Sequence, residues 1–212
     1  LGLPLVISHI ALITAPNSDG QRDFLQELSR NKHQYSFKVT EFLTTIQGDN
    51  AHKLILEQLR LIEESKEPFD VVAIVRGGGS LADFKPFDDY ELSAAVAKFQ
   101  VPIYTGIGHD RNQSIVDLMA REQKTPTKVA SLFVDHNFEF ENSLIDLKRR
   151  LGDTIADQLE NAKERLEHAR RIIRLSSPQD ILNRGFAIIT SNNKIVVDPA
   201  TIREDMQLQT IL

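Results

Sequence analysis

The chain has 212 residues, a net charge of −5 and 41% hydrophobic residues, which is the composition of a folded globular protein. It contains no cysteine, and this excludes disulfide scaffolds, thiolate zinc sites and cysteine nucleophiles. We therefore expect it to work in the reducing cytoplasm. No apolar run approaches the roughly 18 residues that cross a bilayer, so we expect no membrane partner. The chain begins with Leu1 instead of methionine, so we expect a piece of a longer protein.

The first 125 residues alternate β-branched runs with amphipathic helical patterns, which predicts an α/β fold with a doubly wound, mostly parallel sheet. The run 71–75 is apolar on both faces and marks a central strand. We expect about four strands, at residues 9–14, 37–42, 71–75 and 101–104. We expect helices between them at residues 19–30, 49–65 and 89–98.

A long helical segment is predicted at 126–177, with Thr125 as its cap and Pro126 at its first position. Apolar residues recur there about every 3.6 residues, which favours one helix through Gly152 over a hairpin turning at Gly152. Residues 139–174 carry eight acidic and eight basic side chains, a balance that favours assembly with protein partners, self-association included, over nucleic-acid binding.

The last part, 178–212, is predicted to be a small β region, because two apolar runs flank Ser191-Asn192-Asn193 in the manner of a hairpin. We therefore expect three parts: an α/β domain at 1–125, the helical segment at 126–177 and this β region.

The strongest local motif is Arg76-Gly77-Gly78-Gly79-Ser80, directly after the central strand. Successive glycines can present backbone N–H groups to an anion, and an arginine adds a planar bidentate donor. Ligands of open α/β sheets bind at the carboxyl ends of the strands. The motif therefore predicts a phosphate-binding loop. The alternative is a tight turn in which the arginine pairs with an acid such as Asp83 or Asp88.

A second loop, after the fourth strand, carries Gly108 and His109 and should lie at the same edge of the sheet. A histidine can move protons near neutral pH, so His109 is a candidate catalytic residue. Asp23, near the start of the first helix, adds a carboxylate to that edge, or it simply favours the helix dipole. No metal site is predicted, because the remaining candidate histidines lack ligand spacing and are expected at the surface. They are His33, His52 and His136.

A dinucleotide or nucleotide-sugar site is an alternative, because Gly77, Gly79 and Ala82 fit G-x-G-x-x-G/A. The motif follows the third strand instead of the first, however, and no acid ends the next strand to hold a ribose. The sequence G-x-x-x-x-G-K-[ST] of phosphate-transferring NTPases is absent.

The order and spacing of several blocks resemble the large subunit of exodeoxyribonuclease VII. The matching blocks are Leu3-Pro4, 13–15, Arg22-Asp23, 46–51, 76–83, Gly108-His109, 115–117, 125–127, 177–178 and 182–186. The resemblance implies degradation of single-stranded DNA from either end to short oligonucleotides, in a complex with many copies of a small helical subunit. It implies little dependence on divalent metal, so no cofactor is required, although Mg²⁺ stays open.

The same resemblance assigns functional positions to Asp23, Arg76 and His109, and a fourth to Asn112, where the family usually has an acid. The amide at that place raises a further alternative, a scaffold subunit whose catalytic site has decayed. The family's N-terminal OB-fold, which binds single strands, has no counterpart in this chain.

Overall fold

The computed structural model describes residues 2–78, 81–108 and 113–211. By its internal contacts the chain divides into two compact units, Leu1–Asp146 and Leu147–Leu212. Within the described ranges, every helix is too short or too polar to span a bilayer.

The first unit is built on a five-stranded sheet in which every neighbouring pair is parallel, with the order β2-β1-β3-β4-β5. This confirms the predicted α/β class. The strands are β1 (His9–Thr14), β2 (Lys38–Leu43), β3 (Val71–Val75), β4 (Ile103–Gly106) and β5 (Arg121–Glu122). Strand β5 was not predicted, because two residues carry no periodicity, and β4 begins two residues later than predicted.

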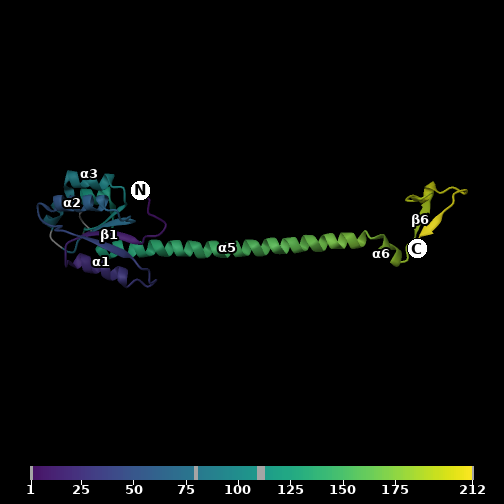
Figure 1. The fold of residues 1–212 in the computed structure, drawn as a ribbon, viewed down its shortest axis with the longest axis horizontal. Coiled ribbons are helices and arrows are strands. Elements are labelled where there is room, and N and C mark those ends of the chain that lie inside the picture. Colours follow the sequence, from purple (N-terminus) through teal and green to yellow (C-terminus); the bar gives the residue numbers. More distant parts are fainter. Residues whose placement is uncertain (1, 79–80, 109–112, 212) are drawn as a thin grey trace. The chain divides into compact units, whose positions relative to one another are not determined.

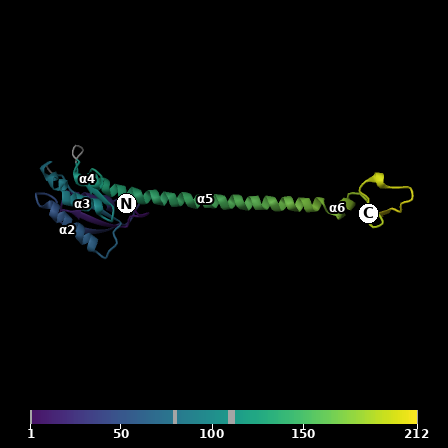
Figure 2. The same cartoon turned by 90° about the horizontal axis from the view of Figure 1, so that it is seen from above.

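Helices cover both faces of this sheet (Figure 1). One face packs against α1 (Asp19–Ser29) and the first turns of α5 (Pro126–Leu175), through buried Phe24 and Phe133. The other face packs against α2 (Ala51–Glu64) and α3 (Tyr90–Lys98), which lie side by side in Figures 1 and 2. Two short elements that the sequence analysis did not predict complete the unit. They are η1 (Leu81–Asp88) and α4 (Ile115–Met119).

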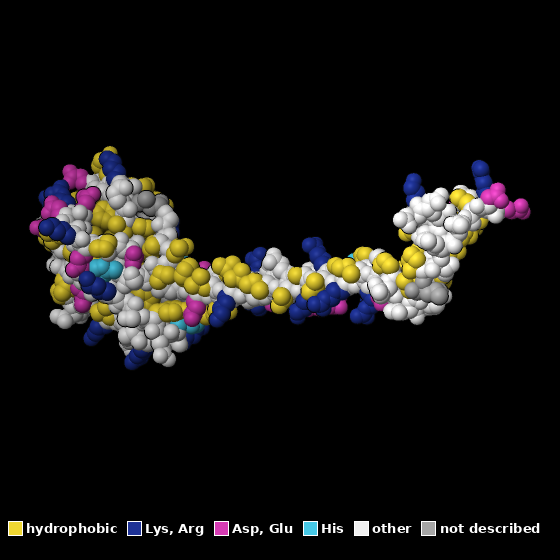
Figure 3. Space-filling model, turned by 45° about the vertical axis from the view of Figure 1, so that its right-hand side comes forward, with side chains coloured by type: hydrophobic (Ala, Val, Ile, Leu, Met, Phe, Trp, Pro, Cys, Tyr) yellow, Lys and Arg dark blue, Asp and Glu magenta, His cyan; other side chains and the backbone are white. Residues whose placement is uncertain are grey.

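The long helix α5 is continuous through Gly152, as predicted. Pro126 is its first residue, and the main-chain N–H of Lys128 donates to Thr125 Oγ1 over 3.3 Å. Its first turns are buried on the sheet, whereas later apolar side chains such as Leu151 and Leu159 are more than half exposed. Figure 3 shows apolar side chains following one another along this exposed part.

The second unit contains a three-stranded antiparallel sheet with the order β7-β6-β8. Asn192 and Asn193 join β6 to β7 with φ angles of 50° and 62°, the backbone of a type I′ turn, so the predicted hairpin is confirmed. The elements of this unit beyond α5 are α6 (Pro178–Asn183), β6 (Ile188–Ser191), β7 (Lys194–Ile195), η2 (Pro199–Thr201) and β8 (Gln209–Ile211).

Candidate active site

Three loops leave the same edge of the parallel sheet. β1, β3 and β4 are neighbours and run in one direction, and Val75 at the end of β3 pairs with Gly106 at the end of β4. The loop that begins at Arg76 therefore starts beside the loop that contains Gly108. This is the edge at which open α/β sheets bind their ligands.

The loop after β3 packs on the first turn of α1, backbone against backbone. A Cβ atom added to Gly20 would lie 2.5 Å from the nitrogen of Gly77 and 2.6 Å from the carbonyl carbon of Arg76. A Cβ on Gly77 would in turn lie 2.9 Å from the nitrogen of Gly20. Neither position has room for a side chain, so both glycines are required for this contact. From the sequence, Gly77 was interpreted only as part of a phosphate-binding or dinucleotide-binding loop, and Gly20 was not singled out.

Arg76 is buried at the end of β3. Its residue is 3% exposed, and its main-chain N–H donates to the carbonyl of Gly106 over 3.2 Å. The guanidinium carbon lies 4.5 Å from the centroid of the Phe84 ring, which η1 supplies. Such stacking fixes the plane of a guanidinium and is favourable for its charge. Phe84 could not be found from the sequence, since nothing in its spacing marks it as the platform for an arginine eight positions earlier.

The alternative partner that the sequence offered for Arg76, Asp88, has another contact. Asp88 Oδ1 accepts the main-chain N–H of Ile115 over 3.0 Å and so ties η1 to the start of α4. The side chain of Asp83, the other acid considered, lies outside the part of the chain that the structure describes.

The ends of β3 and β4 differ in how closely they are packed. Among the described residues, no atom lies within 4 Å of a Cβ built on Gly78, whereas a Cβ built on Gly106 would lie 2.9 Å from the carbonyl oxygen of Thr125. The end of β4 is therefore packed against the start of α5, and Gly108 is buried two residues later. The remaining predicted site residues of these two loops lie outside the described residues. They are Gly79, Ser80, His109 and Asn112.

Asp23 lies on α1, one turn beyond Gly20, and is exposed. Ser18 caps this helix, with its Oγ accepting the N–H of Gln21 over 3.1 Å. The structure thus sets the helix that carries Asp23 directly against the Arg76-Gly77 backbone. In the described ranges, no group of three or more His, Asp or Glu side chains could hold a metal ion.

A capping box fixes the chain that follows residue 112. Ser114 Oγ donates to Asp117 Oδ2 over 2.8 Å, and the N–H of Asp117 donates back to Ser114 Oγ over 3.2 Å. The residue Asp117 is 2% exposed, and its Oδ1 finds no hydrogen-bond partner among the described residues. The sequence analysis did not predict α4 or its cap.

The three histidines expected at the surface are each partly covered by other segments. The ring of His33 stacks on Phe138 of α5 at 4.0 Å between centroids, and His136 Nε2 lies 2.7 Å from the carbonyl oxygen of Pro4. The same packing lets the hydroxyl of Tyr35 donate to the Glu141 carboxylate, which raises the pKa of Tyr35 to about 12. α5 brings these distant segments together, and no local pattern shows that.

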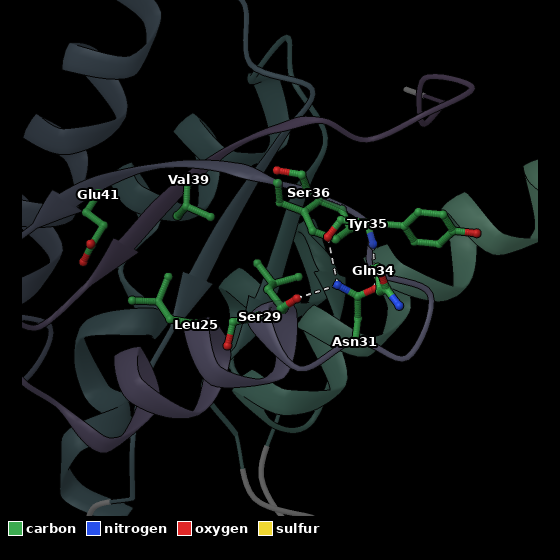
Figure 4. A pocket seen from close by; sticks show the side chains of 10 residues that line it. Leu25, Ser29, Asn31, Gln34, Tyr35, Ser36, Val39 and Glu41 are labelled. Atoms are coloured by element: carbon green, nitrogen blue, oxygen red, sulfur yellow. Dashed lines mark hydrogen bonds between the residues drawn. The ribbon is translucent and has the colours of Figure 1, made fainter.

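The cavity drawn in Figure 4, of about 630 Å³, does not belong to this site. It lies between the last turns of α1, the following loop and β2, whereas Gly20 meets the Arg76 loop at the first turn of α1. Asn31 shapes its wall by donating from Nδ2 to the carbonyls of Leu28 and Tyr35 over 2.7 and 2.9 Å. Its lining contains no arginine, lysine or histidine, so it lacks groups that attract a phosphate.

Residues 1–176 match the family model described as exonuclease VII, large subunit. The chain belongs to this family. Proteins named exodeoxyribonuclease 7 large subunit are similar to it: that of Clostridium acetobutylicum is 30% identical over 197 residues, covering 92% of this chain and 48% of the relative. That of Pseudothermotoga lettingae is 31% identical over 194 residues, covering 91% and 49%. This family member thus spans about half the length of the curated relatives it matches.

Membership in the exonuclease VII family disfavours the dinucleotide and nucleotide-sugar alternatives. Among solved structures, the lysine decarboxylase LdcF of Francisella novicida aligns over 66% of this chain and 18% of its own, with a TM-score of 0.39 and 9% identity. That likeness is too weak to bear on function.

Proposed function

We propose that this chain forms the nuclease part of a large subunit that hydrolyses phosphodiester bonds of single-stranded DNA, from either end, to short oligonucleotides. Residues 1–125 carry the site. The observation that carries the proposal is the buried Arg76, stacked on Phe84 at the ligand-binding edge of the sheet in a chain of the exonuclease VII family.

Arg76 and the backbone N–H groups of its loop hold the scissile phosphodiester and stabilise the negative charge that grows on its oxygens. The anion-binding residues are Gly77, Gly78, Gly79, Ser80 and Gly108. Two features support this role. The Arg76 guanidinium stacks on Phe84, and no described atom lies within 4 Å of a Cβ built on Gly78. A guanidinium fixed in advance costs no reorganisation during the reaction.

His109 acts as the general acid or base, Asp23 orients the attacking water or the imidazole, and Asn112 completes the set. Water attacks phosphorus, the bond from phosphorus to the leaving sugar oxygen breaks, and that oxygen takes a proton. Support comes from Gly108, the residue before His109, which lies in the loop that follows β4, and β4 ends beside the end of β3. One arginine and one histidine replace the clustered carboxylates of a metal-dependent nuclease, so we expect activity to persist in EDTA.

The helix over 126–177 binds protein helices, either those of a small subunit or that of a second copy, in the cytoplasm. Its apolar side chains beyond Asp146 are exposed, and charges beside them are neutralised within the helix. The ion pairs are Arg149–Asp153, Lys163–Glu160 and Arg170–Glu167. A neutral surface with an apolar stripe fits a protein helix better than a DNA backbone.

The proposal is tested on the full-length large subunit assembled with its small subunit, using end-labelled single-stranded DNA. His109→Ala should lower the rate at least about 10²-fold, which is the usual contribution of a general acid or base. Gln100→Ala, at an exposed position in the loop that leads into β4, at the opposite edge of the sheet, is the control and should leave the rate unchanged. A His109→Ala complex as fast as the wild type would reject the assignment, and an inactive wild-type complex would favour the decayed scaffold.

A further inference from the structure

Tyr90 begins α3 with its side chain turned to solvent. It is 83% exposed, more than any other large hydrophobic side chain described in the first unit. Ile115, at the start of α4, is 42% exposed, and α3 contacts α4. An aromatic ring left this open in a folded unit offers a flat surface to a planar ligand.

The chain path places Tyr90 close to Arg76. Phe84 carries the Arg76 guanidinium, and from Phe84 to Asp88 the 3₁₀ rise of 2.0 Å per residue amounts to about 8 Å. The two further residues to Tyr90 add at most about 7 Å. The Cα atom of Tyr90 therefore lies within about 15 Å of that of Phe84, a span that a few linked nucleotides bridge. Because helices of parallel βα units begin at the carboxyl ends of the strands, Tyr90 lies at the same edge as the candidate active site.

A cavity of about 420 Å³ opens at the start of α3, where the N-cap residue Asp89 is part of its wall. It is lined by Asp49, His52, Lys85, Pro86, Asp88 and Asp89. Two of its acids are engaged by helix starts, because Asp88 Oδ1 accepts from the N–H of Ile115 and Asp89 Oδ1 accepts from the N–H of Leu92, each over 3.0 Å. Asp49, Lys85 and His52 also line the cavity. The cavity therefore has mixed charge, and affinity for a nucleic acid there has to come mainly from stacking.

We infer that Tyr90 is the stacking platform of a nucleotide subsite for the DNA strand whose scissile phosphate lies at Arg76. The base stacks on the Tyr90 ring, and Lys85 in the adjoining cavity contacts a phosphate of the same strand. Stacking of bases on aromatic rings is tolerant of sequence, because every base has a π-face. The inference rests on the proposed function and adds to it a binding residue outside the candidate catalytic set.

The test compares Tyr90→Ala and Tyr90→Phe in the full-length complex. Tyr90→Ala should raise KM for a single-stranded oligonucleotide by about 5-fold to 100-fold, while Tyr90→Phe stays near the wild-type value because the ring is kept. The ratio of the KM of Tyr90→Ala to the KM of Tyr90→Phe should not fall when the salt concentration is raised, since salt screens phosphate contacts but not stacking. Leu61→Ala, which removes a half-exposed apolar side chain from α2, is the control and should change nothing.

A second arm uses oligonucleotides in which one abasic residue is moved stepwise from the end. At one position the missing base should raise the wild-type KM by the same factor as Tyr90→Ala, and the variant should show no further loss there. Abasic effects that add to Tyr90→Ala at every position, or a Tyr90→Ala complex with unchanged KM, would overturn the subsite and leave the nuclease assignment standing. A wild-type complex that degrades no DNA would overturn both.

Discussion

Both units of this chain contain helices with an apolar stripe, but they differ in whether that stripe is buried. In the first unit the apolar stripes of α1, α2 and α3 are buried on a sheet whose strands β1 and β3 are buried along their whole length. In the second, α5 keeps its stripe, but the stripe is exposed. A period of 3.6 residues therefore predicts a helix and its apolar face, but what covers that face depends on other parts of the chain or on other chains.

The sharpest way to test this contrast is to truncate one apolar residue of α5 in each unit. Phe133 is 0% exposed and packs edge-on against Phe24 and Tyr104, with centroids 6.2 and 5.2 Å apart. Phe133→Ala should lower the free energy of unfolding by about 3–5 kcal/mol, measured by denaturant titration of the chain. Leu159→Ala, at a 57% exposed position, should cost less than about 0.5 kcal/mol. Equal losses would contradict the division.

Replacing one glycine by alanine in each unit should change the stability of the chain in opposite directions. Gly20→Ala drives a methyl group into the backbone at Gly77 and should destabilise the chain by about 1–3 kcal/mol, with loss of nuclease activity. Gly152→Ala lies within α5, where an added Cβ meets nothing within 4 Å, and should stabilise the helix by up to about 1 kcal/mol. Thermal melting measures both. A neutral Gly20→Ala would mean that the α1 contact with the Arg76 loop is not tight.

The two units can also be compared through polar side chains that hydrogen-bond at helix starts, one buried and one exposed. Asp117→Ala removes both bonds to buried Ser114 and should cost about 1–2 kcal/mol. Asp198→Ala removes an exposed cap of η2 in the second unit, where water replaces the lost hydrogen bond. It should lower the free energy of unfolding by only a few tenths of the amount lost in Asp117→Ala. If both variants unfold at the same denaturant concentration, burial does not explain how much the hydrogen bonds of Asp117 stabilise the chain.

The smallest expected effect is at Lys38, the first residue of the outermost strand β2. The hydrogen bond from Lys38 Nζ, and then its charge, hold the pKa of Glu67 below the ordinary 4.5. A lowered folded-state pKa stabilises the fold above the unfolded value, and this contribution is lost as the pH falls through the folded pKa. Lys38→Ala should return the Glu67 pKa towards 4.5 in an NMR titration and flatten the acid limb of stability. An unmoved pKa would rule out Lys38 as the cause.

Elements with a clear period could be predicted from the sequence. β1 and β3 were predicted at their observed bounds, and α5 was predicted to pass through Gly152. Short elements were missed, β5 and α4 among them, because two or five residues show no period and are fixed by the strands and caps around them.

The candidate site was also only partly predictable from the sequence. The Arg76 loop was predicted, because its chemistry is local in the sequence. Its supports were not: Phe84 beneath the guanidinium and Gly20 against Gly77 are contacts between segments that only the fold brings together. The packing of His33 against Phe138 could not be predicted for the same reason, since Phe138 lies 105 positions later in the chain.

The most direct test of the nuclease assignment is Arg76→Lys in the full-length complex, assayed on single-stranded DNA at a temperature where melting curves show wild type and variant folded. The substitution keeps a positive charge and removes the planar fork stacked on Phe84. A fall in kcat of at least about 10²-fold is predicted, as for the loss of a preorganised donor at the reacting phosphate. Degradation at the wild-type rate would show that Arg76 does not act on the scissile phosphate.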